Sequence, residues 1–282
     1  MVTMSTSTLP RTASPIGRQM LNKVPEVTLY FWVIKILCTT VGETAADYIN
    51  VTKNFGLTNT TYVTGALLAV LLLAQFRLRR YVPALYWSNV VVISVFGTLI
   101  TDNLTDVYNV SLVTSTIIFS VCLAAIFAVW FAVERTLSMH SIVTSRRETF
   151  YWLAILFTFA LGTATGDLVA ERAGLGYWPS VALWGGIIAV IALLHFKAGL
   201  QSVLAFWMAY ILTRPLGASI GDGMSQAKGD GGFAFNLGTT VTSIIFLTLI
   251  LTLVVFLSIT KRDQTPPDLI EADLARGAPA RT

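Results

Sequence analysis

Long apolar segments alternate with short polar connections along the whole chain. A membrane-spanning helix needs roughly 20 predominantly apolar residues, and eight stretches meet that requirement. They lie at about 28–50, 60–79, 83–103, 110–133, 148–170, 178–199, 200–222 and 236–260. The pattern therefore predicts an all-α membrane protein with eight transmembrane helices.

A Trp, a Gly and an Asp recur at fixed spacing in every second segment, and we call these four the signature segments. In each, the Gly follows the Trp by ten residues and the Asp follows it by fifteen. The sets are Trp32, Gly42, Asp47; Trp87, Gly97, Asp102; Trp152, Gly162, Asp167; and Trp207, Gly217, Asp222. Successive Trp are 55, 65 and 55 residues apart, which predicts four tandem two-helix repeats. Because each repeat has an even number of spans, all four enter the membrane in the same direction.

Composition supports the membrane assignment and narrows the possible chemistry. The chain is 55% hydrophobic and 12% charged, with a mean hydropathy of +0.70, which is too apolar for a soluble domain. The two Cys lie in apolar runs and the two His near span ends, so neither a disulfide framework, a thiolate cage nor a multi-His metal site is indicated. The net charge of +4 comes from cations beside the spans, which indicates topology and no nucleic-acid binding.

The distribution of Lys and Arg predicts the orientation. Cations precede the first span and follow the second, fourth, sixth and eighth, so the positive-inside rule places both termini in the cytoplasm. The Trp of the repeats then lie near the inner interface and the Asp near the outer side. We expect a flexible cytoplasmic tail at 1–22, one transmembrane domain at 23–260 and a disordered cytoplasmic tail at 261–282. The four repeats are expected at about 24–80, 81–140, 146–199 and 200–260.

Polar side chains form a stripe along one face of each signature segment. Positions seven, eleven and fifteen after the Trp share a helix face. The stripes are Thr39, Glu43, Asp47; Ser94, Thr98, Asp102; Phe159, Thr163, Asp167; and Arg214, Ala218, Asp222. A carboxylate inside a span costs roughly 2.5 to 3.5 kcal/mol on insertion scales, and the C-terminal end of a helix disfavours an anion further. Four acids at this position therefore indicate a cationic partner.

Simpler roles stay open for several of these residues. Each Asp could mark the outer boundary of its span and cap the next turn of the chain, most readily Asp102; Glu43 and Asp47 lie deeper and are the strongest functional candidates. Trp is common at membrane interfaces, so anchoring is favoured over ligand contact, and the Gly are expected to be packing points. Lys35 and Arg214 are expected to pair with Glu43 or one of the Asp.

A resemblance accompanies these motifs. The opening stretch Lys23-Val-Pro-Glu-Val-Thr, followed by 35–47 (KILCTTVGETAAD), resembles a bacterial family of membrane proteins with four tandem two-helix repeats, each with a characteristic Trp. The family is described as uncharacterised membrane-anchored protein. The resemblance covers about residues 24–260, implies a multi-pass protein of the bacterial inner membrane, and supplies no catalytic residues.

The sequence favours a gradient-driven transporter, an exporter, of a hard metal cation such as Mn²⁺, Mg²⁺ or Al³⁺. Hard cations take oxygen ligands, and protons could exchange at the same carboxylates; no cofactor is expected. The expected ligands are Glu43, Asp47, Asp102, Asp167 and Asp222, with Thr39, Thr40, Thr44 and Thr98 as secondary oxygens. The alternatives are a transporter of an organic cation or other small solute, an intramembrane enzyme, which four equivalent Asp do not favour, and a membrane anchor or regulator.

Overall fold

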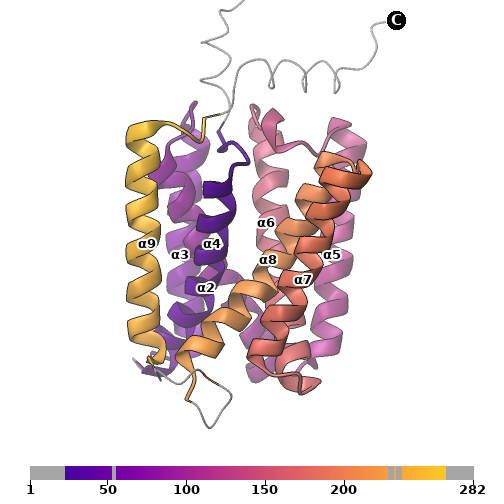
Figure 1. Ribbon diagram of the computed structural model, residues 1–282. Coiled ribbons are helices and arrows are strands. Elements are labelled where there is room, and N and C mark those ends of the chain that lie inside the picture. The colour runs from indigo at the N-terminus through magenta and orange to yellow at the C-terminus, as the bar shows by residue number, and fades with distance from the viewer. Residues whose placement is uncertain (1–22, 53–54, 228–231, 233–236, 265–282) are drawn as a thin grey trace, which may run out of the picture.

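The computed structural model describes residues 23–52, 55–227, 232 and 237–264, and within these residues the protein is an all-helical bundle (Figure 1). The long helices are α2 (Leu29–Asp47), α3 (Leu57–Arg77), α4 (Pro83–Asp102), α5 (Leu112–Glu134), α6 (Ser145–Asp167), α7 (Tyr177–Ala198), α8 (Ser202–Ser225) and α9 (Gly238–Thr260). All eight are long and apolar enough to cross a membrane. The prediction of eight spanning helices in four two-helix repeats is confirmed.

The four helices that carry the Trp, Gly and Asp, which we call the signature helices, form a closed ring. Helix α2 packs on α4, α4 on α6, α6 on α8, and α8 returns to α2. Between 56% and 67% of the most apolar window of each signature helix is buried, against 11% to 33% in the companion helices α3, α5, α7 and α9. The ring is therefore the interior of the bundle, and the companions form its outer wall.

Each companion helix packs on the signature helix of the next repeat. Helix α3 contacts α4, α5 contacts α6, α7 contacts α8, and the last companion, α9, closes the circle against α2. The four repeats thus interlock in one direction around the ring. This arrangement agrees with repeats that all cross the membrane in the same sense.

The signature Gly permits the close approach of neighbouring helices in the ring. A Cβ at Gly42 would lie 2.7 Å from the Cβ of Ser94, and a Cβ at Gly217 would lie 2.6 Å from the Cβ of Thr39. Gly97 and Gly162 meet Phe159 and Arg214 in the same way. In all four contacts, position ten after one Trp meets position seven of the next repeat. Only a residue without a side chain allows this spacing.

Local sequence sets where the helices begin and end. Thr28, Ser111 and Thr144 accept a hydrogen bond from the backbone at the starts of α2, α5 and α6, as N-cap residues do. Helix α8 runs unbroken through Pro215. No turn of α8 is unwound at Pro215 or Gly217, although Pro215 has no backbone N–H to donate to the carbonyl four residues earlier.

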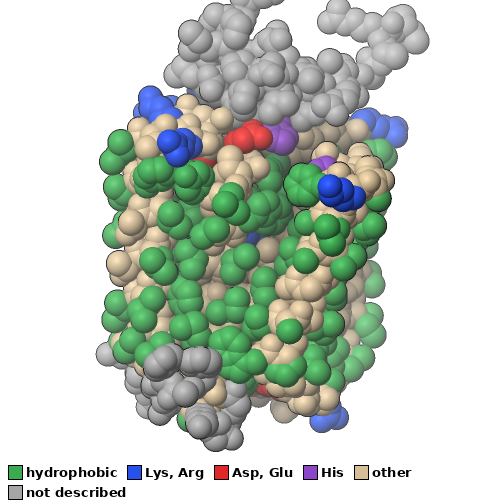
Figure 2. Space-filling model, in the orientation of Figure 1, with side chains coloured by type: hydrophobic (Ala, Val, Ile, Leu, Met, Phe, Trp, Pro, Cys, Tyr) green, Lys and Arg blue, Asp and Glu red, His purple; other side chains and the backbone are tan. Residues whose placement is uncertain are grey.

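Helix α2 begins and helix α9 ends at the same end of the bundle (Figure 1), and Lys and Arg gather at this end more than at the other in the view of Figure 2. The cytoplasmic position of this end stays a prediction. The packed fold continues past 260, because the Asp263 carbonyl accepts from the Glu26 amide at 2.7 Å and the Asp263 side chain is buried. The expected tail at 1–22 and residues 265–282 of the expected tail at 261–282 lie outside the described residues.

Candidate cation site at the axis of the ring

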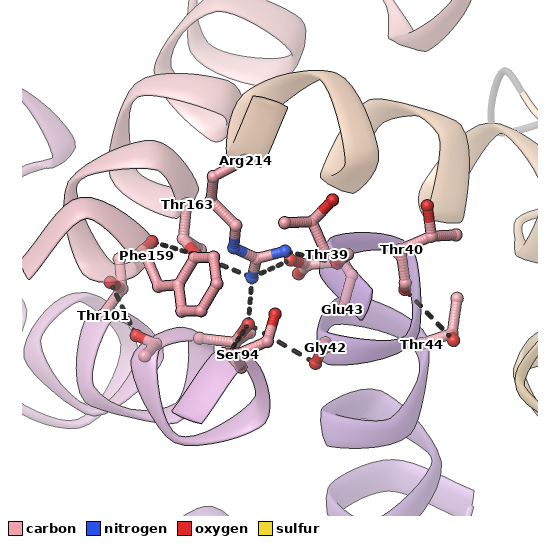
Figure 3. Close-up of polar contacts among 12 residues, drawn as sticks. Thr39, Thr40, Gly42, Glu43, Thr44, Ser94, Thr101, Phe159, Thr163 and Arg214 are labelled. Atoms are coloured by element: carbon pink, nitrogen blue, oxygen red, sulfur yellow. Dashed lines mark hydrogen bonds and ion pairs between the residues drawn. The ribbon is translucent and has the colours of Figure 1, made fainter. Parts of the chain in front are cut away.

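The polar stripes of the four signature helices meet at the axis of the ring (Figure 3). Two successive layers are buried on all sides. One consists of Thr39, Ser94, Phe159 and Arg214, and the next consists of Glu43, Thr98, Thr163 and Ala218. The predicted stripes are thus brought together at these two positions of each repeat, although they are far apart in the sequence.

Arg214 occupies the centre of this polar region. Its Nη1 donates to the Thr39 carbonyl at 2.6 Å, and its Nη2 donates to Glu43 Oε2 at 2.8 Å and to Thr163 Oγ1 at 2.9 Å. Nη2 also contacts Thr98 Oγ1. The guanidinium therefore reaches all three of the other signature helices (Figure 3), and it forms the ion pair with Glu43 that the sequence suggested.

Two further polar atoms of these layers are buried without a hydrogen-bond partner. They are Arg214 Nε and Ser94 Oγ. An unpaired buried donor costs free energy, so the central network is less than fully satisfied. Such groups are places where a water or a ligand gains binding energy.

Lys35 lies one helical turn from this cluster and differs from what the sequence suggested. Its Nζ has no hydrogen-bond partner and lies 4.1 Å and 4.2 Å from the ring centroids of Phe159 and Tyr210. The residue is completely buried. The expected pair with Glu43 or an Asp is therefore wrong for Lys35, because Arg214 takes Glu43 and two aromatic faces receive the amine.

The four signature Asp lie in the layer beyond, at the other end of the stripe. Asp102 lies within electrostatic range of Glu43, Asp47 and Asp167, and Asp222 within range of the same set. In the part of the chain that the structure describes, none of the four forms an ion pair. Asp167 lies within electrostatic range of Arg214, but that guanidinium is paired with Glu43.

Two of these acids, Asp102 and Asp167, do not cap the turn that follows them, and the acids do not form one compact ligand set. Asp102 and Asp167 make no side-chain capping hydrogen bond to the π-helical turns η2 (Asn103–Val107) and η4 (Leu168–Arg172) that come directly after them. Among the described residues, no three His, Cys, Asp or Glu are grouped closely enough to hold a metal ion. The five carboxylates expected as metal ligands are therefore not gathered around one position in the described residues.

The hydroxyls expected as secondary ligands divide into two groups. The Thr98 hydroxyl accepts from Arg214, whereas Thr39 meets Arg214 only through its carbonyl and donates its hydroxyl to the carbonyls of Ile36 and Thr213. Thr40 donates to the carbonyl of Ile36 at 3.1 Å. Thr44 donates to the Thr40 carbonyl at 3.3 Å and accepts from Ser243 of α9 at 2.8 Å. Thr40 and Thr44 thus lie on the side of α2 away from the guanidinium (Figure 3). Thr163, which the stripe contains but the expected ligands omit, takes their place.

The signature Trp pack inside one end of the bundle. Trp87, Trp152 and Trp207 are buried in the main hydrophobic cluster, and Trp32 is half-buried. The indole of Trp207 donates to the Leu137 carbonyl at 2.9 Å. The rings of Trp87, Trp152 and Trp207 fill the space between helices, which corrects for these three the interpretation that they anchor the protein at the membrane interface.

Aromatic rings also close the axis at the Trp end. The residues that precede the Trp, which are Phe31, Tyr86, Tyr151 and Phe206, are all buried. The hydroxyls of Tyr86 and Tyr151 lie 2.5 Å apart and share a hydrogen bond. The axis is therefore blocked at this end by aromatic side chains, on the opposite side of Arg214 from the four Asp.

A second buried ion pair at the Trp end was missed by the sequence interpretation. Lys23 Nζ donates to Glu148 Oε2 at 2.6 Å and to the Phe76 carbonyl at 3.2 Å. Gln75 Nε2 donates to Glu148 Oε1 at 3.3 Å. Glu148 and Gln75 lie at the inner limits of two predicted spans, and this position is the signal that could have revealed the pair. Nothing in the sequence places them next to Lys23.

A cavity of about 650 Å³ lies beside the ring, between α2, α7, α8 and the segment 137–140. Glu26, His140 and His195 line one part, Ile36 and Thr213 another, and most of the remaining lining is apolar. In Figure 2, acidic and His side chains lie near the upper rim of the hollow in this face. Because the Thr213 carbonyl accepts from Thr39 at 3.2 Å, the cavity ends next to the central cluster.

Comparison with known proteins agrees with the four-fold repetition. No curated protein and no solved structure matches the chain. A family model described as "Repeat of Unknown Function (DUF347)" matches four successive segments, at residues 30–81, 85–136, 150–200 and 205–263. Each segment holds one signature helix and its companion, and together they cover most of the chain, which therefore belongs to this repeat family.

Proposed function

We propose that the protein is a gradient-driven transporter, an exporter, of a hard metal cation of the Mn²⁺, Mg²⁺ or Al³⁺ type, and that the cation moves along the axis of the ring. One observation carries the proposal. Oxygen atoms from α2, α4 and α6 converge on a single buried positive charge at the axis, and four Asp without an ion-pair partner among the described residues lie at one mouth of the same path.

The chemistry of the axis suits a hard cation. Carboxylate, hydroxyl and carbonyl oxygens are the ligands that such ions prefer, and Glu43, Thr98, Thr163 and the Thr39 carbonyl supply one set of them. Cys38 belongs to the hydrophobic cluster, and both His line the lateral cavity at the Trp end. Soft or imidazole ligands are therefore not offered along the described axis.

The four Asp would attract cations to their mouth of the path and exchange protons during transport. They lie near enough to one another to interact electrostatically, and intramembrane acids commonly serve as ion ligands and proton carriers. The chain contains no Walker motif to couple transport to nucleotide hydrolysis. A proton gradient is the energy source that these side chains can use, and the positive-inside rule would place the Asp on the outer side.

The decisive experiment measures metal sensitivity in a strain that lacks the gene. We expect raised cell content of one hard metal when that metal is in excess, and rescue by the wild-type chain. Glu43→Gln or Asp47→Asn should abolish rescue, whereas Asp106→Asn, an exposed acid at the same end, should retain it. If both Glu43→Gln and Asp47→Asn still rescue the strain, the assignment of these residues to the site is wrong. Substrate turnover by the purified protein in detergent, without any gradient, would indicate an enzyme instead.

A second candidate substrate is an organic cation, and two observations favour it. The lateral cavity that ends at Thr213 is mostly apolar, and the Lys35 amine already lies against the faces of Phe159 and Tyr210. Aromatic faces bind organic cations well. Proteoliposome uptake separates the two candidates: Phe159→Leu should reduce the flux of a quaternary ammonium compound if that is the substrate, and leave Mn²⁺ flux unchanged if the metal is.

A further inference from the structure

The oxygen atoms around Arg214 have the composition of a cation site. One carboxylate (Glu43), two hydroxyls (Thr98 and Thr163) and one backbone carbonyl (Thr39) surround the guanidinium, and we call these four groups the oxygen cage. They come from three different helices, so the cage exists only when the ring is assembled. Nη2 alone contacts three of the four groups.

We propose that the oxygen cage is the central binding site for the transported cation, and that the Arg214 guanidinium is a tethered cation that fills it in the closed state. The inference rests on the proposed cation transport and deepens it. An incoming cation and the guanidinium compete for the same oxygens. Arg214 therefore determines when the cage is open to substrate.

Charge makes the competition exclusive. The cage holds one carboxylate, and the guanidinium already forms an ion pair with it. Two cations in a buried site with one carboxylate repel each other at short range. A metal ion can occupy the cage only after the guanidinium has left, and the return of the guanidinium expels the ion.

Two features of its surroundings determine how the Arg214 side chain is held. Its Nε has no partner, so the guanidinium is held by only part of its hydrogen-bonding capacity. The aliphatic stem lies against Gly162, where an added Cβ would come within 2.4 Å of Arg214 Cγ. Position seven of the other three repeats holds Thr, Ser or Phe. The fourth repeat alone therefore carries the tethered cation.

The test compares Arg214→Ala with wild type in proteoliposomes loaded for Mn²⁺ flux. Without the tethered cation we expect uphill accumulation to be lost and downhill flux to rise. If the guanidinium leaves the cage open for only a tenth of the time in wild type, the rise is about tenfold. Added guanidinium chloride should block this flux in Arg214→Ala and have no effect on wild type. Arg147→Ala removes a cation from a buried ion pair with Glu134, away from the axis, and should show no flux that responds to guanidinium.

Binding of guanidinium provides a readout that does not depend on metal transport. Guanidinium at concentrations below those that denature should raise the melting temperature of Arg214→Ala, relative to matched NaCl, and leave Arg147→Ala unchanged. The absence of this shift, together with flux insensitive to guanidinium, overturns the inference. If wild type moves no Mn²⁺ but Arg214→Ala binds guanidinium, the oxygen cage stands and the metal assignment falls.

Two further variants keep the test decisive if Arg214→Ala does not fold. Arg214→Gln retains most of the length and a hydrogen-bond donor without the charge, and it should show the same guanidinium effects. Gly162→Ala leaves Arg214 in place but crowds its stem, so the guanidinium should be displaced and downhill flux should rise. Wild-type coupling in a folded Gly162→Ala and no guanidinium effect in Arg214→Gln would refute the role of the side chain.

Discussion

The signature helices are more polar than the companion helices and yet are more buried. In soluble proteins the more apolar helices are the more buried ones. The most apolar windows of the signature helices have mean hydropathies between 1.2 and 1.7, and those of the companions between 1.6 and 2.6. The signature helices nevertheless form the interior. In a membrane the polar groups gain by facing one another, because lipid offers them no partners.

The contrast also shows how each set is held in place. The companions present Leu, Ile and Val outward, and many of their hydroxyls bond to their own helix, as Thr248 does to the Ile244 carbonyl. The signature helices contribute Gly contacts, a buried ion pair and hydroxyls that bond between helices. Substitutions in the ring should therefore have large and specific effects, and matched substitutions in the companions should have small ones.

The largest effect is expected where the ring meets a companion at the Trp end. Glu148→Ala on α6 leaves Lys23 buried without its acid and removes an acceptor from Gln75 of α3. Removal of one partner from a buried ion pair costs about 3–5 kcal/mol. We expect a large fall in the detergent melting temperature. The double variant Lys23→Met with Glu148→Leu should recover most of the loss; a double variant less stable than Glu148→Ala would contradict this explanation.

The next effect comes from adding one methyl group to a Gly of a signature helix and, as a control, to a Gly of a companion helix. A Cβ at Gly217 of the ring would lie 1.9 Å from Thr39 Oγ1 and 3.1 Å from the Thr40 backbone nitrogen, whereas nothing lies within 4 Å of a Cβ at Gly186 on α7. Gly217→Ala should destabilise the protein by about 1–3 kcal/mol through overpacking. Gly186→Ala should be neutral or stabilise it by up to about 1 kcal/mol. Equal melting temperatures for the two variants would disprove the close approach of α8 and α2.

The spacing of Trp, Gly and Asp was sufficient to predict much of this fold. A period that returns four times fixes the number of repeats, and hydropathy fixes the number of spans. The same spacing placed positions seven and eleven on one face, so Glu43, Thr98 and Arg214 were singled out before their contacts were known. Neither pattern states which helices are neighbours, so the packing of each companion on the next repeat could not be derived.

Two kinds of site residue show where sequence reasoning fails. The sequence predicts an ion pair between Lys35 and an acid, and Glu43 is the nearest acid along the chain. In the structure Glu43 pairs with Arg214 instead. Which of two cations pairs with one acid depends on distances in three dimensions, which the sequence does not give. Thr40 and Thr44 were expected beside Glu43 because they are close to it in sequence, yet a rotation of 100° per residue turns them toward other helices. Thr163, which is distant from Glu43 in the sequence, contributes one of the four groups of the oxygen cage.

A pair of Thr→Val variants compares a hydroxyl of the ring with a hydroxyl of a companion helix, and the expected effects on stability are smaller than those above. Thr98→Val removes one acceptor from Arg214, which keeps Glu43 and Thr163, so the expected loss is about 1 kcal/mol. Thr248→Val on α9 removes a hydroxyl that is exposed and bonds within its own helix, so stability should change by less. Transport assays should show reduced coupling in Thr98→Val only. A Thr98→Val protein with wild-type stability and coupling would argue against the cage.

The smallest effect concerns Asp263, which follows the last companion helix, α9, and contacts the segment between α3 and α4. Its Oδ2 accepts from the Tyr81 hydroxyl. Burial raises the pKa of the Asp263 carboxyl, and the Tyr81 hydrogen bond offsets part of the rise. The folded protein then binds this proton more tightly than the unfolded chain, so stability falls as the pH rises from the unfolded value, about 3.9, through the folded one.

Asp263→Asn removes this titration but keeps an oxygen that can accept from Tyr81. Relative to wild type, its stability should therefore increase with pH across the acidic range and become constant above the folded pKa. Tyr81→Phe should make the wild-type slope steeper, because the carboxylate loses the hydrogen bond that stabilises it. Melting temperatures of the three proteins measured at several pH values provide the test. If the difference between Asp263→Asn and wild type does not vary with pH, Asp263 titrates normally, and the segment after α9 lies in water instead of packing against the ring.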